Sequence, residues 1–265
     1  MANTPRRLAR GVTPWILEWV ASPPSMTAPA STSTSTPPRL HALIPCAGSG
    51  SRAGTEVPKQ YQILAGQPLV AHTLAAFAQV KRLASVLVVV APGDDTLARA
   101  GALPARVQVA DCGGATRAAS VQAGLRELAR RGASQDDWVL VHDAARCLIT
   151  PALIDRLIDA CLPDPVGGLL AQPLADTLKY GPEGRVAATL PREGHWLAQT
   201  PQMFRLAALA QALQTAGTSV TDEASAIEAA GLQPRLVPGS ARNFKVTWPE
   251  DFALAQALLA SPKDV

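Results

Sequence analysis

Apolar runs and amphipathic segments alternate along the chain from residue 40 onward. Residues 85–91 (SVLVVVA) form a continuous, largely β-branched run, which is typical of a strand buried on both faces. Residues 117–131 carry apolar positions at helical spacing, and Thr150-Pro151 supplies an N-cap followed by proline at the first helical position. Similar patterns predict strands at 40–45, 106–110, 138–142 and 243–247, and helices at 69–80, 151–162, 205–215, from Thr221 onward, and 249–259. The alternation predicts an α/β fold, a Rossmann-like, mostly parallel sheet with helices on both faces.

Two segments depart from this alternation. Residues 21–39 are rich in Ser, Thr, Pro and Ala, so we expect 1–39 to be a flexible extension that precedes one domain at 40–262. Residues 174–190 contain two short runs around Gly181-Pro182-Glu183-Gly184, a pattern that predicts a β-hairpin. Because these runs are too polar for a central strand, we expect an arm of about residues 174–192 to project from the sheet.

Composition excludes several classes of protein. The chain has 265 residues, of which 48% are apolar, enough for a packed core, and no apolar run approaches the roughly 18 residues of a membrane span. The formal charge of +3 resides in the first 40 residues, because the remainder holds 20 basic and 20 acidic residues. We therefore expect no nucleic-acid partner and no membrane. The four cysteines show neither metal-site nor C-x-x-C spacing, which favours a reduced cytoplasmic location.

The glycine-rich segment that follows the first predicted strand, residues 45–60 (PCAGSGSRAGTEVPKQ), has three interpretations. Residues 48–53 satisfy the dinucleotide fingerprint G-x-G-x-x-[GA], but no acidic residue lies between Glu56 and Asp94 to bind a ribose. Pro58 also interrupts the helix that such a site needs. A P-loop is excluded because no Gly-Lys-Ser/Thr follows the glycines.

The third interpretation is a triphosphate site. Closely spaced glycines let backbone N–H groups approach phosphate oxygens, and Arg52 and Lys59 are placed to bracket the phosphate chain. Charge neutralisation and positioning of this kind are what phosphoryl or nucleotidyl transfer requires. The alternative is a glycine turn with two solvated cations.

Further candidate groups follow later segments. Asp143 stands at the carboxyl end of a predicted buried strand, where a carboxylate facing a triphosphate is a natural Mg²⁺ ligand; the alternative is that it caps the next loop. Arg146 is placed to pair with Asp143 or to reach a phosphate. Thr221 opens a predicted helix whose free N–H groups suit an anion, and the position of Lys245 in an apolar strand suggests that its ammonium emerges at the active edge.

Together these motifs carry a resemblance. Six motifs occur in the following order over residues 41–260: A-G-x-G-x-R with P-K-Q, G-G-x-x-R-x-x-S, V-H-D-A-A-R, D-T, T-P-Q and N-x-K-V-T. The chain resembles the 2-C-methyl-D-erythritol 4-phosphate cytidylyltransferases of the non-mevalonate isoprenoid pathway, which have the nucleotide-diphospho-sugar transferase type of fold. The resemblance implies transfer of CMP from CTP to methylerythritol phosphate with Mg²⁺, giving 4-CDP-2-C-methyl-D-erythritol and pyrophosphate.

The resemblance also implies a role for each matching residue and a homodimer whose arms embrace. The catalytic residues would be Arg52, Lys59 and Lys245; the nucleotide-binding residues Cys46, Ala47, Gly48, Gly50, Gly114 and Ser120; the substrate-binding residues Arg146, Thr177, Arg192 and Thr221; and the metal ligand Asp143. The chain departs from the family at Ala119 and Cys147, where Asp and Pro are usual. Another polyol phosphate such as ribitol 5-phosphate stays open as substrate, and an NAD(P)-binding oxidoreductase is the alternative from another class.

Overall fold

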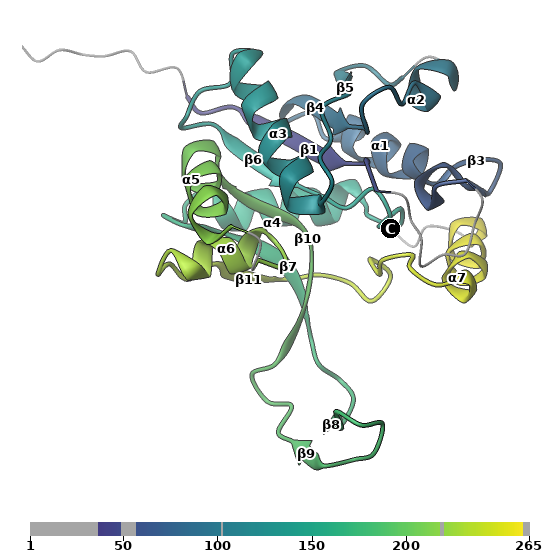
Figure 1. Ribbon diagram of the computed structural model, residues 1–265, viewed down its shortest axis with the longest axis vertical. Helices are drawn as coiled ribbons and strands as arrows, with labels where there is room; N and C mark the ends of the chain where they lie inside the picture. Colours follow the sequence, from purple (N-terminus) through teal and green to yellow (C-terminus); the bar gives the residue numbers. More distant parts are fainter. Residues whose placement is uncertain (1–36, 49–56, 102, 218–219, 262–265) are drawn as a thin grey trace, which may run out of the picture. The chain divides into compact units, whose positions relative to one another are not determined.

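Seven strands form one sheet in the order β11-β7-β10-β6-β1-β4-β5 (Figure 1). The structure is a computed structural model that describes residues 37–48, 57–101, 103–217 and 220–261. All of these residues belong to one compact unit that begins at Pro37. The strands of the sheet are β1 (Leu40–Pro45), β4 (Leu83–Val89), β5 (Val107–Ala110), β6 (Trp138–Val141), β7 (Gly167–Pro173), β10 (Trp196–Arg205) and β11 (Arg235–Pro238).

Strand direction brings most of the carboxyl ends to one edge. β1 pairs in parallel with β4 and β6, β4 with β5, and β7 with β11, whereas β10 runs antiparallel to both of its neighbours. Leu43 of β1 lies opposite Leu87 on one side and Val141 on the other. The mostly parallel α/β architecture is therefore confirmed.

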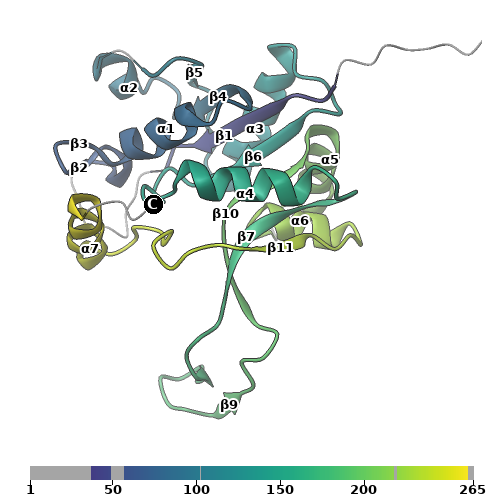
Figure 2. The ribbon, with the colours of Figure 1, turned by 180° about the vertical axis from the view of Figure 1, so that it is seen from behind.

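Helices cover both faces of the sheet (Figures 1 and 2). On one face, α1 (Leu69–Gln79) and α4 (Pro151–Cys161) pack on alternate strand residues such as Ile44. On the other, α3 (Arg117–Arg130), α5 (Leu206–Ala216) and α6 (Glu223–Ala229) pack on the intervening residues such as Leu43. Successive side chains of a strand point to opposite faces, so continuous apolar runs supply both cores.

The starts of two helices follow from local sequence. The Thr116 hydroxyl accepts a hydrogen bond from the Ala119 N–H at 3.1 Å, and the Thr150 hydroxyl accepts one from the Leu153 N–H at 3.3 Å. Each threonine thus satisfies an otherwise unpaired N–H group of the first turn. Because Thr116 caps α3, Arg117 is the first residue of that helix and lies at the carboxyl edge of the sheet.

Two predicted elements are wrong in detail. Residues 243–247 form no strand; their apolar pattern reflects burial beneath α7 (Pro249–Ala260), where Val246 is fully buried and its N–H donates to the Ala145 carbonyl. The sheet ends instead at β11, which is short and largely exposed and so gives little periodic signal. The cap of α6 is Asp222 and not Thr221, because the Asp222 carboxylate accepts from the Ser225 N–H at 2.9 Å.

The arm continues from the ends of β7 and β10. Beyond their last pair, the short strands β8 (Leu178–Tyr180) and β9 (Ala188–Leu190) pair antiparallel, and the whole segment projects from the sheet (Figure 1). Its exposed apolar side chains include Tyr180 and Val186, which are 54% and 67% exposed. A two-stranded ribbon of this kind buries little surface of its own.

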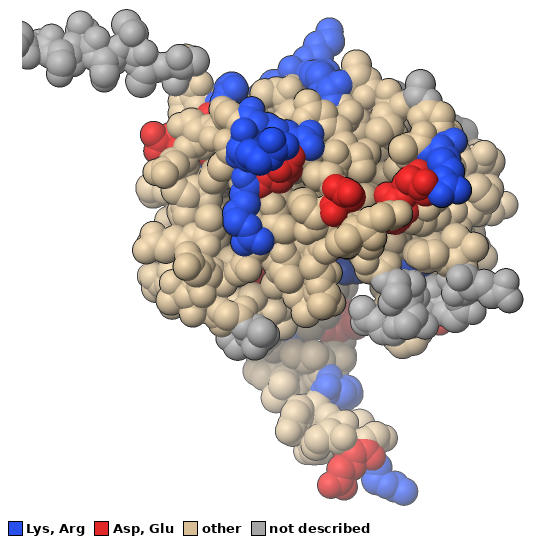
Figure 3. All heavy atoms as spheres, turned by 45° about the horizontal axis from the view of Figure 1, so that its top comes forward, with Lys and Arg blue, Asp and Glu red and all other residues tan. Residues whose placement is uncertain are grey.

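Smaller elements complete the described residues. The 3-10 turn η2 (Lys59–Tyr61) and the hairpin of β2 (Ile63–Leu64) and β3 (Gln67–Pro68) lead into α1, and α2 (Thr96–Arg99) follows β4. On the face drawn in Figure 3, basic and acidic groups lie near one another, in line with the near-neutral composition after residue 40. Within the ranges that the structure describes, no helix is both long and apolar enough to cross a membrane.

Candidate active site

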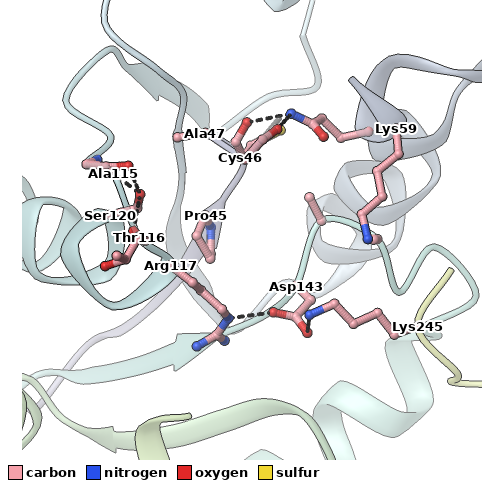
Figure 4. A pocket seen from close by; sticks show the side chains of 15 residues that line it. Pro45, Cys46, Ala47, Lys59, Ala115, Thr116, Arg117, Ser120, Asp143 and Lys245 are labelled. Carbon is pink, nitrogen blue, oxygen red and sulfur yellow. Dashed lines mark hydrogen bonds and ion pairs between the residues drawn. The ribbon is translucent and has the colours of Figure 1, made fainter. Parts of the chain in front are cut away.

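A cavity of about 500 Å³ opens at the carboxyl edge of the sheet (Figure 4). Its walls come from the end of β1, the start of η2, the first turn of α3, the residues after β6 and the segment before α7. Eight of the residues predicted for the site line it: Cys46, Ala47, Gly48, Lys59, Gly114, Ser120, Asp143 and Lys245. Segments far apart in the sequence meet here because the carboxyl ends of parallel strands share one edge.

Asp143 stands at the centre of a cluster of cations. Its Oδ1 atom lies 2.8 Å from Arg117 Nε, and its Oδ2 atom lies 2.9 Å from Lys245 Nζ and 3.6 Å from Arg146 Nε. Burial alone would raise the pKa of Asp143, but the three cations outweigh burial and hold that pKa well below its ordinary range. The carboxylate is therefore ionised at every pH at which the protein would be assayed.

Arg117 is a functional candidate that the sequence pattern did not single out. Its Nη1 and Nη2 atoms lie 2.6 and 3.0 Å from the two carboxylate oxygens of Glu223, so one guanidinium bridges two acidic groups. Burial opposes the charge on Arg117, but Glu223 and Asp143 raise its pKa above the ordinary value. The signal was present in the motif G-G-x-x-R-x-x-S, where this arginine served only to mark the start of a helix.

Two lysines reach the same cavity from different elements. The ammonium groups of Lys59 and Lys245 both turn toward the space beside Asp143 (Figure 4), and Lys59 Nζ donates to the Val246 carbonyl at 2.9 Å. Lys245 does so from a loop and not from the strand that was predicted. Two further predicted residues, Arg52 and Gly50, lie outside the described residues.

Short hydrogen bonds brace each nucleotide loop from within. Gln60 Nε2 donates to the carbonyls of Cys46 and Gly48 at 3.0 and 2.8 Å. Ser120 Oγ accepts from the Gly114 N–H at 3.1 Å and donates to the Thr116 carbonyl at 2.9 Å. These contacts hold residues 46–48 of the first loop and residues 114–120 of the second along the cavity wall, and they commit the Ser120 hydroxyl to its own loop.

The loops also touch where glycine allows it. A Cβ atom built on Gly113 would lie 2.3 Å from Ala47 Cβ and 2.7 Å from the Val90 carbonyl oxygen. Real Cβ atoms do not approach other atoms so closely, so only glycine permits this packing. The two nucleotide loops are therefore in close contact at Gly113 and Ala47.

The residues predicted to bind the second substrate are spread over three places. Arg146 is packed beneath Asp143, where its Nη1 donates to the Asn243 carbonyl at 2.7 Å. Thr221 lines a neighbouring cavity of about 430 Å³, which shares Thr116 and Arg117 with the first. Thr177 and Arg192 lie on the arm and line neither cavity; Arg192 donates to the Ala175 carbonyl.

The balance of charge favours a polyanion. Four cations (Lys59, Arg117, Arg146 and Lys245) stand against the two carboxylates Asp143 and Glu223, which leaves a net charge of +2 in the described part of the site. His142 adds none, because burial lowers its pKa to about 3. A triphosphate would complete the neutralisation.

The donor set also fits Mg²⁺. Asp143 is the one carboxylate among the described residues that line the cavity, and no group of three potential metal-ligating side chains occurs in the described ranges. Each Asp143 oxygen accepts one short hydrogen bond and so keeps a second lone pair. Mg²⁺ is usually held by one or two carboxylates together with substrate phosphates and water, which is what this cavity offers.

A parallel sheet with glycine loops and lysines converging on one aspartate at its carboxyl edge defines a nucleotide-binding α/β transferase, a nucleotidyltransferase. The particular family is shown by its model, 2-C-methyl-D-erythritol 4-phosphate cytidylyltransferase (IspD), which matches residues 40–261. The chain belongs to this family. The NAD(P)-binding oxidoreductase is thereby excluded, and the resemblance drawn from the motifs is confirmed.

Individual relatives agree with the family model. The bifunctional enzyme IspD/IspF of Albidiferax ferrireducens is 67% identical over 224 residues, which cover 84% of this chain and 54% of that protein. The 2-C-methyl-D-erythritol 4-phosphate cytidylyltransferase of Burkholderia cenocepacia is 56% identical over 230 residues, 85% of this chain and 98% of that protein. The chain thus spans about half of the bifunctional relative and almost all of the second relative.

A solved structure extends the comparison to three dimensions. The crystal structure of a 4-diphosphocytidyl-2C-methyl-D-erythritol synthase matches with a TM-score of 0.73 at 38% identity, over 85% of this chain and 100% of that chain. The fold of this family is therefore the fold of this chain. The chain is an enzyme of the nucleotidyltransferase class, a cytidylyltransferase of isoprenoid precursor synthesis.

Proposed function

We propose that the chain transfers CMP from CTP to 2-C-methyl-D-erythritol 4-phosphate, with release of pyrophosphate. The observation that supports the proposal is the convergence of Lys59, Lys245 and two nucleotide loops on the carboxylate of Asp143 in one cavity. A cavity of about 500 Å³ lies in the range of small-ligand pockets. The net positive charge of its walls suits a substrate that carries three phosphates.

The reaction needs positioning more than it needs proton transfer. A phosphate oxygen of the polyol phosphate attacks the α-phosphorus of CTP, a new P–O bond forms, and the bond to the β-phosphate oxygen breaks as pyrophosphate leaves. The nucleophile is already an anion at neutral pH, so no general base is required. Lys59 and Lys245, with Arg52, stabilise the charge that grows on the α-phosphate oxygens, each at roughly 10²–10³-fold in rate by analogy with oxyanion donors.

Asp143 is the residue that would hold Mg²⁺ in this proposal. The bound cation would neutralise phosphate charge and fix the conformation of the triphosphate. The chain's own contribution is to keep the Asp143 carboxylate ionised and aimed at the cavity, through the contacts with Arg117 and Lys245.

The second substrate is proposed to bind Arg146, Thr221 and, from a second copy of the chain, Thr177 and Arg192. The support is the arm, which exposes apolar side chains such as Tyr180 and buries little surface of its own. A second arm packed against it would cover these side chains and bring Thr177 and Arg192 to the partner's cavity. Cytoplasmic location stays a prediction, supported by the four cysteines, all of which are free.

The decisive assay measures pyrophosphate release. With CTP, Mg²⁺ and methylerythritol phosphate, we expect turnover that is abolished by a chelator and is at least about tenfold weaker with UTP or ATP, since base contacts in the transition state are lost. Ribitol 5-phosphate serves as the competing acceptor. Faster turnover with ribitol 5-phosphate would make it the substrate in place of methylerythritol phosphate. If no acceptor led to pyrophosphate release, nucleotidyl transfer would be rejected.

Mixing experiments test the shared site. Arg192→Ala and Lys59→Ala are each expected to be nearly inactive, because each removes a cation from every site of the homodimer. After mixing and subunit exchange, the heterodimer would contain one site with both cations, so part of the activity should return. A mixture that stays inactive although heterodimers form would contradict the contribution of the arm to the partner's site.

A further inference from the structure

Arg117 occupies the wall between the two cavities. It lines both the nucleotide cavity, with Asp143, and the neighbouring cavity, with Thr221 and Glu223. Of the five N–H groups of its guanidinium, the Nε–H faces Asp143 at 2.8 Å, while one N–H of each terminal nitrogen faces Glu223. The planar guanidinium thus binds Glu223 through two hydrogen bonds and Asp143 through one.

Glu223 is a rigid anchor for this arrangement. Its side chain is 1% exposed, and it is the first residue of α6. The start of α6 is itself held from the sheet, since Gln202 of β10 accepts from the Ala224 N–H at 2.7 Å and donates to Asp222 at 2.7 Å. The position of Glu223 is therefore set by contacts that do not involve Arg117, so Glu223 determines where the guanidinium lies.

We infer that Arg117 is a positioning residue, held by Glu223, which orients the carboxylate of Asp143 toward the nucleotide cavity and leaves a lone pair on each of its oxygens. The inference rests on the proposed function and deepens it. Two-pronged pairing between arginine and a carboxylate is the strongest geometry open to them. Because Glu223 takes that geometry, Arg117 binds Asp143 through Nε alone, and Asp143 stays available to a cation beside the triphosphate.

Two substitutions separate this role from simple packing. In Glu223→Gln the terminal nitrogens of Arg117 lose their charged partner. The guanidinium is then free to bind Asp143 through two hydrogen bonds and so to compete with Mg²⁺ for that carboxylate. In Arg117→Lys a single ammonium replaces the fork and cannot reach both carboxylates at once. The matched controls are Glu228→Gln on the exposed side of α6 and Arg126→Lys on the exposed side of α3.

The test measures CTP binding by calorimetry over a range of Mg²⁺ concentrations, without the polyol phosphate, together with steady-state turnover and melting temperature. For Glu223→Gln we expect the Mg²⁺ concentration that half-saturates CTP binding to rise about tenfold, because Asp143 becomes less available. For Arg117→Lys we expect turnover to fall about tenfold to a hundredfold while the KM for CTP stays within a factor of three. This pattern is expected because the Asp143 carboxylate would lose its orientation toward the reacting groups. The two controls should match the unaltered chain in all three measurements.

The outcomes distinguish the inference from the proposed function. If the unaltered chain releases no pyrophosphate, the proposed function fails. If it is active and both variants lower only the melting temperature, leaving Mg²⁺ half-saturation and turnover like those of the controls, Arg117 is merely structural and the inference is overturned. Should Glu223→Gln fail to fold, Arg117→Lys decides by its turnover, since lysine keeps the positive charge at this position and so disturbs the fold less.

Discussion

The substitution Asp143→Asn probes the centre of the charge cluster. It keeps the shape of the side chain and removes one negative charge that lies within 4.0 Å of nitrogen atoms of Arg117, Arg146 and Lys245. Arg117 keeps Glu223 as a partner, but Arg146 loses its ion pair, and its buried Nε atom already has no hydrogen-bond partner. The variant therefore leaves a buried cation poorly compensated.

The expected loss of stability follows from this geometry. Removing one partner of a buried ion pair costs roughly 3–5 kcal/mol in the free energy of unfolding, and we expect the lower end, about 3 kcal/mol. The reason is that the side chain of Lys245 is 32% exposed and so is partly screened by water. For a domain of this size that loss lowers the melting temperature by about 10 °C.

Activity should fall in Asp143→Asn, whereas metal-free anion binding should not weaken. The net charge of the described site rises from +2 to +3, so metal-free binding of pyrophosphate, measured by calorimetry, should be unchanged or tighter. Turnover should fall by about 10²–10³-fold, because a group that acts on the transition state is lost. The control is Asp95→Asn, an exposed carboxylate paired with Arg99, which should alter stability by less than about 1 kcal/mol.

Three outcomes would contradict this account of the charge cluster. If Asp143→Asn retains turnover within about threefold, below the loss expected of a transition-state group, Asp143 is not part of the reacting site. If its melting temperature moves no more than that of Asp95→Asn, the cations do not depend on this carboxylate and the electrostatic account of the cluster is wrong. Weaker binding of pyrophosphate would contradict the assigned net charge.

Three further predictions concern separate features. Lys59→Met should lower turnover by about 10²–10³-fold while the fold is retained, because the methylene stem is kept and the losses are the cation and its hydrogen bond to the Val246 carbonyl; near-normal pyrophosphate release would reject its role. Gly113→Ala should raise the KM for CTP at least about tenfold and destabilise the protein by about 1–3 kcal/mol, since its Cβ would meet Ala47 Cβ at 2.3 Å; adding Ala47→Gly should restore part of both losses, and an additive loss would contradict the clash. On acidification from pH 7 to pH 5, the free energy of unfolding should fall by about 2 kcal/mol through His142. In the unfolded chain this histidine gains a proton below about pH 6.5, whereas in the folded protein its pKa is about 3, so acid favours the unfolded chain. Denaturant titrations that show constant or rising stability would contradict this sign.

Local sequence was enough to predict most elements of the fold. Continuous β-branched runs predicted buried parallel strands such as β4, and Thr150 with Pro151 marked where a helix begins, because both signals depend on residues a few positions apart. The same local reasoning failed at residues 243–247, since a buried loop beneath a helix shows the same apolar pattern as a strand. It also left out β7 and β10, whose pairing joins the two sides of the arm.

For the candidate site, too, local sequence predicted some features and missed others. Local sequence identified which chemical groups follow the predicted strands, and parallel topology made it possible to expect Lys59 and Asp143 in one cavity, whereas Lys245 was assigned to a strand and reaches the cavity from a loop. The pairing of the charges depends on the packed fold: Arg117 and Glu223 are 106 residues apart in the chain and meet because α3 and α6 pack on the same face of the sheet. Pairing of buried charges depends on which side chains the packed core brings within about 4 Å, the distance at which an ion pair forms, and no local pattern records that distance.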